Sequence, residues 1–192
     1  MSEVESRSRA LTSHAKWEVL AKIGQIIGSS LEIDEVYQRF AAEAQKLIPF
    51  DQIAIVTIDR DLGVFTDSYV SGLEIPQQVT GGVRSMSGSL TEEIAETGSS
   101  VLFHSGDRSE VALRFPGLLP VFDAGLRSFL SIPLKSKDAV IGGLHLRSIK
   151  LNAYTNRAVS LAESVASQVA GAIASARLYA EGKRVEIALG ES

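Results

Sequence analysis

The segment that decides the fold covers residues 127–181 and reads RSFLSIPLKSKDAVIGGLHLRSIKLNAYTNRAVSLAESVASQVAGAIASARLYAE. Two apolar runs at its start, Arg127–Leu134 and Val140–Ser148, flank the polar turn Lys135–Asp138. Apolar runs that are joined by a short polar turn predict a β-hairpin. From Asn156 onward, apolar residues recur every three or four positions, which predicts a long helix. The segment therefore predicts a hairpin followed by a helix.

The predicted C-terminal helix carries an apolar seam. Its residues are spaced alternately by three and four positions: Val159, Ala162, Ala166, Val169, Ile173, Ala176 and Ala180. This heptad spacing is typical of helices that pack along another helix. Because four of the seven side chains are alanines, a partner helix can approach closely. We expect the helix to be a core element and also part of a homodimer interface.

Two further helices are predicted before the first strand. Ser13–Gly28 carries two adjacent apolar stripes, which favours packing against both the domain body and a partner helix. Asp34 is an N-cap candidate for the next helix, which continues to Ile48. It ends there because Pro49 has no amide hydrogen and disfavours helix at the residue before it.

The middle of the chain predicts strands and one short helix. Gln52–Asp59 is apolar on both faces and predicts a central strand, which a tight turn joins to a return strand at Val64–Ser71. Ser89 is the N-cap candidate of a short helix that stops at Gly98, and Val101–Phe103 predicts a short strand.

Two long stretches lack a regular pattern. They are Gly72–Gly88 and Ser105–Gly125, and a loop as long as the second is usually functional and often a lid. The predicted strands come as hairpins rather than as βαβ units. We therefore expect an α+β fold with an antiparallel sheet of five to six strands.

Composition excludes several classes of function. The chain has 192 residues, of which 45% are hydrophobic and 22% charged, and its formal net charge is -4. Lys and Arg do not cluster as they do in nucleic-acid-binding proteins, so we expect no nucleic-acid partner. No apolar run approaches the roughly 20 residues of a membrane span, so we expect no membrane insertion of this segment.

The chain contains no cysteine. This excludes disulfides, thiolate metal sites, a cysteine nucleophile and a thioether-linked chromophore. It fits a reducing compartment, and we expect a cytoplasmic location. His14, His104 and His145 are dispersed without metal-ligand spacing, and no nucleophile elbow, P-loop, dinucleotide or zinc-protease motif occurs. We therefore expect no enzymatic activity.

Several pieces of the chain, in order, resemble the GAF domain family. They are the SIPL of residues 131–134, the VIGGL of residues 140–144 and the AIASARLY of residues 172–179. The earlier helices and strands also fit, so that the resemblance covers about residues 31–181. It implies a sensor domain of bacterial signalling proteins such as sensor histidine kinases.

The resemblance also implies an architecture and a division of the chain. The N- and C-terminal helices would pack on one face of the sheet, and the short helix and long loop would lie over a ligand pocket on the other. Residues 1–30 would form a signalling and dimerisation helix, and residues 31–181 the GAF domain. Residues 182–192 would begin a linker to a downstream PAS, kinase or other output module.

Alternation in the hairpin strands provides a check that is independent of the resemblance. One face carries only aliphatic side chains, which suits a helix-packed core: Leu130, Ile132, Leu134, Leu144 and Leu146. The other face is mixed: Phe129, Ser131, Pro133, Gly143, His145 and Arg147. A mixed face suits a polar-lined pocket, and it suits a solvated surface equally well.

Five residues are the candidates for ligand contact: Phe122, Phe129, Ser131, His145 and Arg147. The resemblance places His145 and Ser131 at strand positions that line the chromophore pocket in bilin-binding relatives. His145 would contact the ligand or respond to pH, or it is an ordinary sheet histidine. Arg147 would pair with an anion, or with an acidic residue of the chain. The two phenylalanines would be apolar walls, or simply core.

The ligand is not identified by the sequence. A covalent bilin is excluded because there is no cysteine, and the cysteine-dependent GAF methionine-sulfoxide reductases are disfavoured for the same reason. The cyclic-nucleotide signature of the family is missing, and haem through His145 or His104 is disfavoured. The leading hypothesis is a small-molecule sensor that relays through a helical homodimer. The alternative is a ligand-free dimerisation spacer.

Overall fold

The computed structural model describes Glu18 and residues 33–190 of the chain. The helix predicted at Ser13–Gly28 therefore lies outside the described residues, apart from Glu18, as does the end of the chain from residue 191. No described helix is both long enough and apolar enough to cross a membrane.

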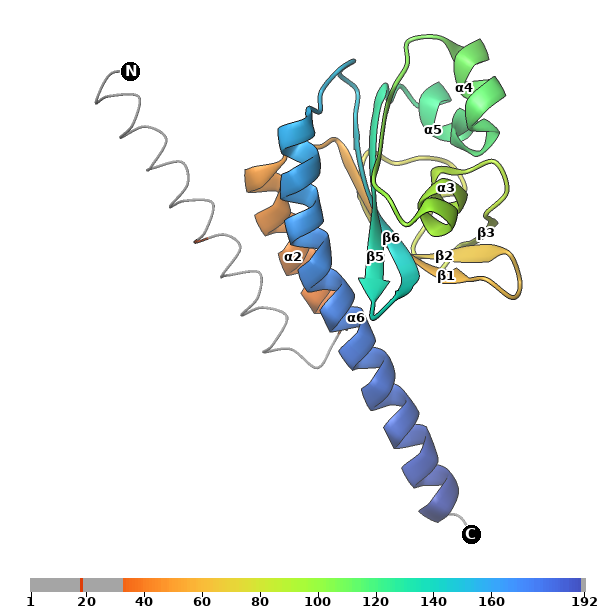
Figure 1. Cartoon of the computed structure of the whole chain (residues 1–192), viewed down its shortest axis with the longest axis vertical. Coiled ribbons are helices and arrows are strands. Elements are labelled where there is room, and N and C mark those ends of the chain that lie inside the picture. Colours follow the sequence, from red (N-terminus) through yellow and green to blue (C-terminus); the bar gives the residue numbers. More distant parts are fainter. Residues whose placement is uncertain (1–17, 19–32, 191–192) are drawn as a thin grey trace.

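A six-stranded antiparallel sheet forms the centre of the molecule (Figure 1). The strand order is β3-β2-β1-β6-β5-β4, so the hairpin predicted from residues 127–148 lies next to the first strand. The strands are β1 (Gln52–Asp59), β2 (Val64–Gly72), β3 (Val83–Ser85), β4 (Val101–His104), β5 (Ser128–Ser136) and β6 (Ala139–Ser148). The α+β class and the antiparallel sheet are confirmed. The short β3 was not predicted, because it lies in the Gly-rich stretch that the sequence analysis treated as loop.

Helix α2 (Ile33–Leu47) and the first part of α6 (Asn156–Gly190) cover one face of this sheet, and the rest of α6 projects beyond it (Figure 1). Between them and the strands lies the main core, which contains the aliphatic side chains that alternation assigned to it: Leu130, Ile132, Leu134, Leu144 and Leu146. Asp34 is not the N-cap of α2, because the helix already includes Ile33. Its carboxylate lies in the first turn, where the partial positive charge of the helix N-terminus stabilises it.

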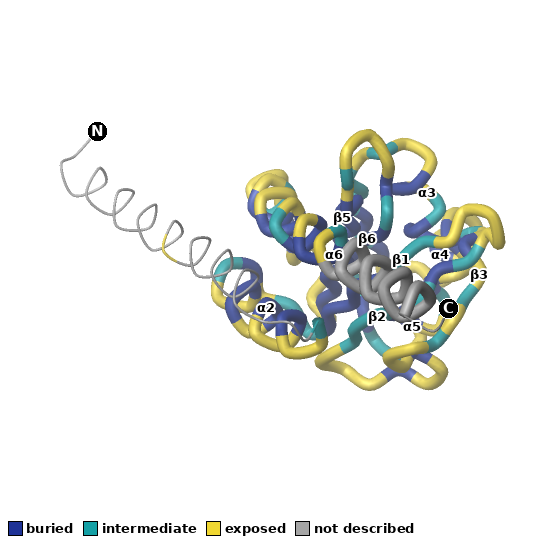
Figure 2. Tube along the Cα trace, turned by 90° about the horizontal axis from the view of Figure 1, so that it is seen from below, coloured by how far each residue is buried: buried dark blue, intermediate teal, exposed yellow. Residues whose placement is uncertain are grey.

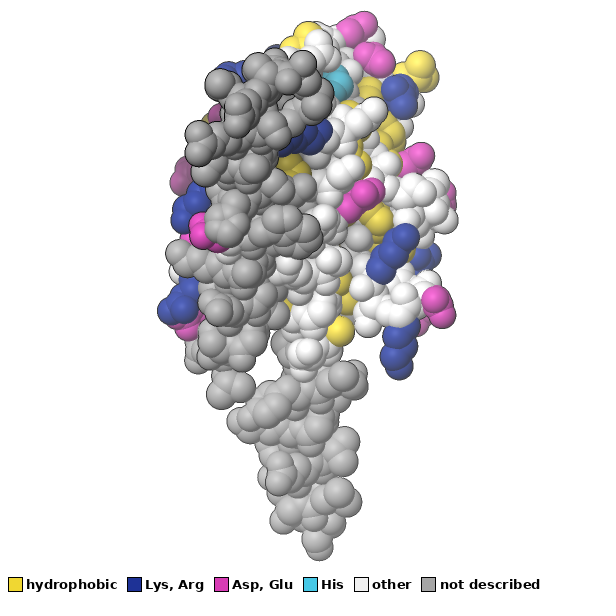
Figure 3. All heavy atoms as spheres, turned by 60° about the vertical axis from the view of Figure 1, so that its left-hand side comes forward, with side chains coloured by type: hydrophobic (Ala, Val, Ile, Leu, Met, Phe, Trp, Pro, Cys, Tyr) yellow, Lys and Arg dark blue, Asp and Glu magenta, His cyan; other side chains and the backbone are white. Residues whose placement is uncertain are grey.

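The apolar seam of α6 faces the sheet from Val159 to Ile173. Ala162, Ala166, Val169 and Ile173 are buried in the main core, and Val159 packs against it. A stripe with this spacing serves sheet packing as well as helix pairing. The exposed face of α6 is a different one and carries mostly small residues: Ser160, Glu163, Ser164, Ser167, Gly171 and Ser175. Figure 3 shows the surface around α6 largely in white, the colour of uncharged polar side chains and backbone.

Short helices cover the opposite face, and we call them the cap: α3 (Leu90–Thr97), α4 (Arg108–Arg114), the 3-10 turn η1 (Pro116–Leu118) and α5 (Leu119–Asp123). Ser89 caps α3 by accepting from the backbone N–H of Glu92, and Gly98 ends it with a positive φ of 63°, as predicted. Figure 2 shows the buried residues concentrated between these layers.

The stretch Ser105–Gly125 is mostly helical, so its interpretation as an irregular loop was wrong. Asp107 caps α4 by accepting from the N–H of Ser109, and prolines open the next two turns. Helices this short contain too few turns for an apolar period to stand out in the sequence.

Candidate functional site

Four of the five predicted residues lie on the sheet face under the cap, and the fifth belongs to the cap itself. Phe129 and Ser131 lie on β5, His145 and Arg147 on β6, and Phe122 on α5. Register pairs Ser131 with His145 and Phe129 with Arg147 across the two strands. Since side chains two apart share a face of a strand, the antiparallel register brings these four together.

His145 is buried and bonded on both sides of its ring. Its Nδ1 lies 2.8 Å from the hydroxyl of Ser131, and its Nε2 lies 3.2 Å from the hydroxyl of Thr91 on α3. Burial, and then the charges of Arg147 and Arg84, hold the pKa of His145 well below its usual value. The imidazole is therefore neutral near pH 7, with one nitrogen donating and the other accepting.

Arg147 is also buried. It follows His145 by two residues on the same face of β6. Its Nη1 donates to Gln52 Oε1 at 2.6 Å and to Gln78 Oε1 at 3.0 Å, and both acceptors are neutral amides. Burial, followed by the charge of Arg84, lowers the pKa of Arg147 to about 10, while Asp67 acts in the opposite direction. The buried guanidinium therefore has no carboxylate of its own within these contacts.

Asp67 is the buried acidic residue of this region, and another arginine holds it. Arg84 donates to Asp67 through Nε at 2.9 Å and through Nη2 at 2.7 Å. The Asp67 side chain is fully buried, and that of Arg84 is 28% exposed. The carboxylate of Asp67 thus bonds to Arg84, and it acts on Arg147 only through its charge. Next to them, Gln78 Nε2 is buried without a hydrogen-bond partner among the described residues.

Aromatic side chains fill the neighbouring space under the cap. Phe129 stacks on Phe103 at a centroid distance of 5.9 Å, and Phe103 meets Phe115 edge-on at 5.2 Å. Phe122 joins the same buried group, and the guanidinium of Arg127 lies 3.9 Å from its ring centroid. We call Phe103, Phe115, Phe122 and Phe129 the aromatic cluster. It packs α4 and α5 onto β4 and β5.

Two clefts lie elsewhere. One, of about 760 Å³, is at the ends of α2 and α6, and the other, of about 380 Å³, is between the end of α3, β5 and α6. Neither is lined by any of the five predicted residues. Within the described part of the chain, no group of three or more His, Asp or Glu residues is arranged to hold a metal ion.

Five residues that bond to Arg147 or His145 or act on them through their charge were not predicted: Gln52, Asp67, Gln78, Arg84 and Thr91. Two of them carried a signal. Gln52 begins an otherwise apolar strand and pairs in register with Arg147. Asp67 is a charged residue two positions after Phe65, on the buried face of β2. Gln78 and Thr91 carried none, because one lies in a loop and the other in the first turn of a helix.

The family of the chain follows from its sequence profile. The model of the GAF domain family matches residues 30–174. The chain belongs to the GAF domain family. A curated relative, the formate hydrogenlyase transcriptional activator FhlA of Escherichia coli, is 24% identical over 173 residues. That match covers 88% of this chain and 25% of the relative, so the chain spans about a quarter of the length of the relative.

Solved GAF structures have the same fold. The GAF domain of an Acinetobacter phosphoenolpyruvate-protein phosphotransferase superposes with a TM-score of 0.70 at 19% identity, covering 86% of this chain and 97% of that one. A free methionine-R-sulfoxide reductase of Neisseria meningitidis, in complex with its substrate, gives 0.67 at 14% identity, covering 85% and 91%. This chain is thus a GAF domain of the kind found in bacterial regulatory and signalling proteins.

Proposed function

We propose that this GAF domain is the regulatory sensor module of a bacterial signal-transduction protein, and that it binds a small anion at Arg147. One observation carries the proposal: a buried guanidinium whose hydrogen-bond acceptors are the neutral amides of Gln52 and Gln78. A buried charge is costly unless an opposite charge pairs with it. Asp67 is already held by Arg84, so a carboxylate or phosphate group would supply the missing negative charge.

The surroundings of Arg147 suit a small ligand with an anionic head. The hydroxyl of Ser131 and the neutral ring of His145 can form uncharged hydrogen bonds. These two residues are paired across β5 and β6 next to Arg147 on the same face. Gln78 Nε2, which is buried without a partner, is a further donor. Phe122 and Phe129 would form the apolar wall. Because the aromatic cluster fills the adjacent space, the ligand has to displace part of the cap on entry.

That displacement gives a route for the signal. β5 and β6 carry the proposed site on one face and pack against α6 on the other. A ligand that shifts the cap and these strands would bias the position of α6. In a homodimer formed through the terminal helices, α6 would carry the change to an output module such as a PAS or kinase domain. We place the domain in the cytoplasm and assign it no catalytic role.

The test is a titration of the purified chain with small anions. The series runs from formate to butyrate and includes inorganic phosphate, with calorimetry as the readout. We expect one of these anions to bind saturably and Arg147→Gln to weaken its binding at least tenfold, since a hydrogen bond to a charged group contributes about 1.5–3 kcal/mol. Lys137→Gln, in the exposed β5–β6 turn, is the control and retains full affinity.

A second candidate function is a ligand-free dimerisation spacer. Two observations favour it: the aromatic cluster packs the space under the cap, and both ring nitrogens of His145 already have partners. The titration separates the two functions. If no anion binds, and native mass spectrometry of freshly purified protein finds no retained small molecule, the spacer function stands and the sensor function is rejected.

A further inference from the structure

The larger cleft lies on the helix side of the sheet, away from the site proposed at Arg147. It has a volume of about 760 Å³ and opens between the C-terminal end of α2 and the N-terminal end of α6. We call it the α2–α6 cleft. Residues from α2, from the turn after it, from the end of β6 and from the start of α6 contribute to its walls. It therefore connects the two terminal helices of the domain.

Tyr154 is the unusual residue of this cleft. Its side chain lines the cleft and is only 4% exposed, yet its hydroxyl has no hydrogen-bond partner among the described residues. Buried hydroxyl groups nearly always have a partner, because an unmade hydrogen bond is costly. Burial, and then the charge of Asp51, raise the pKa of Tyr154, so the phenol stays protonated and is available as a donor.

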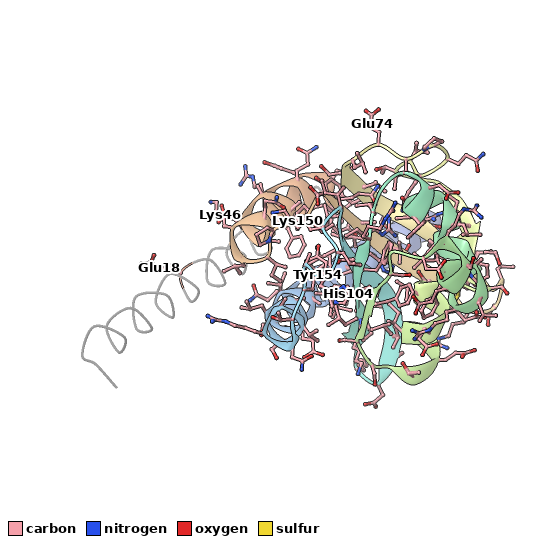
Figure 4. The ribbon with its side chains drawn as sticks, turned by 90° about the horizontal axis from the view of Figure 1, so that it is seen from above. Glu18, Lys46, Glu74, His104, Lys150 and Tyr154 are labelled. Carbon is pink, nitrogen blue, oxygen red and sulfur yellow. The ribbon has the colours of Figure 1, made fainter. Side chains whose placement is uncertain are left out.

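Hydrogen bonds hold the backbone that leads into Tyr154. Ser128 donates through Oγ to the carbonyl of Lys150 at 2.6 Å and accepts from the N–H of Ala153 at 3.0 Å. Asp51 accepts from the hydroxyl of Ser148 and from the N–H of Ile149. Figure 4 shows Tyr154 and Lys150 between α2 and α6.

The charge of the cleft is predominantly positive. Its lining contains Lys46, Lys150 and Arg157 and one acidic residue, Asp51. Lys46 is paired with Glu43 at 2.7 Å, whereas Lys150 and Arg157 form no ion pair with a described residue. The N-terminus of the 35-residue helix α6 opens on the same side, and its partial positive charge also favours an anion.

We propose that the α2–α6 cleft is a second binding site and that it takes a compact organic acid. Because Tyr154 Oη is buried, the ligand has to open the inner wall of the cleft; a carboxylate oxygen then accepts from Tyr154 Oη and lies within the field of Lys150 and Arg157. An apolar body rests on Leu47, Phe50 and Leu161, which line the same cleft. Bound there, the ligand touches both terminal helices and fixes the end of α2 against the start of α6.

The experiment titrates the full chain with benzoate, which combines a carboxylate with an apolar ring. Benzamide is the uncharged match, and inorganic phosphate is an anion without an apolar body. We expect saturable benzoate binding by calorimetry, and tighter binding of benzoate than of either comparison probe. Tyr154→Phe should weaken benzoate about tenfold, and Lys150→Gln should weaken benzoate but not benzamide. Amide NMR shifts should map the binding to residues 153–158.

Matched variants control for folding. Tyr69→Phe removes a hydroxyl from β2, outside the cleft, and Lys137→Gln removes a lysine from the turn between β5 and β6; neither should change benzoate affinity. Tyr154→Phe should melt at the same temperature as the wild type or higher, because it removes an unsatisfied group. A lower melting temperature would mean that the hydroxyl has an internal partner, and would overturn the proposal.

Three further results would also overturn it. They are the absence of saturable benzoate binding, an affinity that Tyr154→Phe leaves unchanged, and NMR contacts that show residues 1–32 or a second copy filling the cleft. The anion site at Arg147 stands or falls separately, because Arg147→Gln tests that site and leaves the α2–α6 cleft intact.

Discussion

His145 is buried between the hydroxyls of Ser131 and Thr91, and its burial, followed by the charges of Arg147 and Arg84, favours the neutral imidazole. The polar residues of this face are therefore not a solvated surface, which was the alternative that alternation left open. They form a buried layer in which hydroxyls, amides and one histidine surround the cation of Arg147. Two consequences can be measured on single residues.

The first is a pH dependence of stability. The pKa of His145 in the folded chain lies below its unfolded value near 6.5, so as the pH falls the unfolded chain binds the proton first. The stability that comes from the neutral ring is complete above pH 6.5 and is lost as the pH falls below it. The slope is at most about 1.4 kcal/mol per pH unit.

Denaturant unfolding between pH 7.5 and 5 measures this slope. His104 also has a pKa lowered by burial, so both chains should carry His104→Gln. In that background His145→Gln should flatten the loss of stability toward low pH. If the slope is the same with and without His145, the ring titrates in the folded state as it does in the unfolded one.

The second concerns Asp67, the buried carboxylate that Arg84 holds. Asp67→Asn removes the buried counter-charge that Arg84 binds directly and that also acts on Arg147, and we expect a loss of about 3–5 kcal/mol in the free energy of unfolding. Asp123→Asn breaks an exposed pair with Arg108 that has the same two-bond geometry, and it should change stability much less. Equal losses in both variants would contradict the assignment of Asp67 as the buried counter-charge.

Sequence reasoning located part of this layer. Alternation along β5 and β6 assigned Ser131, His145 and Arg147 to one face, because a strand turns successive side chains to opposite sides. It could not identify the acceptors of Arg147. One of them, Gln78, lies in a loop, and loop geometry depends on tertiary contacts that leave no periodic trace in the sequence.

At the scale of elements, the predictions that succeeded rest on repeated signals. The long helix α6 and the hairpin β5–β6 carry several periods of apolar residues, and α3 is marked by its caps, Ser89 and Gly98. Strand β3 has three residues and α5 has five, too few to show a period. Their positions are set by contacts with β2 and with the aromatic cluster, which sequence alone does not reveal.

The closeness of α3 to the sheet gives a prediction at this scale. A Cβ at Gly143 would lie 2.7 Å from Ile94 Cδ1 and 3.0 Å from His145 Nε2. Ile94 is fully buried, so it cannot move aside without disturbing its own packing. Gly143→Ala should therefore push α3 from β6 and destabilise the domain by about 1–3 kcal/mol.

Thermal unfolding and NMR can test this. The imidazole resonances of His145 should shift, because Thr91 moves away with α3. Gly171→Ala provides the comparison, since a Cβ there meets nothing within 4 Å. If Gly143→Ala is as stable as wild type and leaves the His145 signals unchanged, α3 is more loosely packed than these distances indicate.

At the scale of the whole molecule, the sheet covers the seam of α6 as far as Ile173, so a second copy that packs along this part of the helix has to use another face. The exposed face of α6 carries Ser160, Ser164, Ser167 and Gly171, small side chains that allow two helices to approach closely. A homodimer through α6 would use this face. The proposal predicts a solution mass about twice the 20.6 kDa of one chain.

Substitutions at Gly171 distinguish a dimer that is paired along this face from a dimer that forms through another surface. Because the space around it is empty in one chain, Gly171→Arg should fold normally and should gain the helix propensity that glycine lacks, about 0.8–1 kcal/mol. In a dimer paired along this face, the long charged side chain would separate the helices. Light scattering should then give the single-chain mass for Gly171→Arg and the doubled mass for Gly171→Ala, which keeps the side chain small. A doubled mass for both variants would mean that another surface joins the copies. A single-chain mass for the wild type at high concentration would remove the dimer, and with it the proposed relay through paired helices.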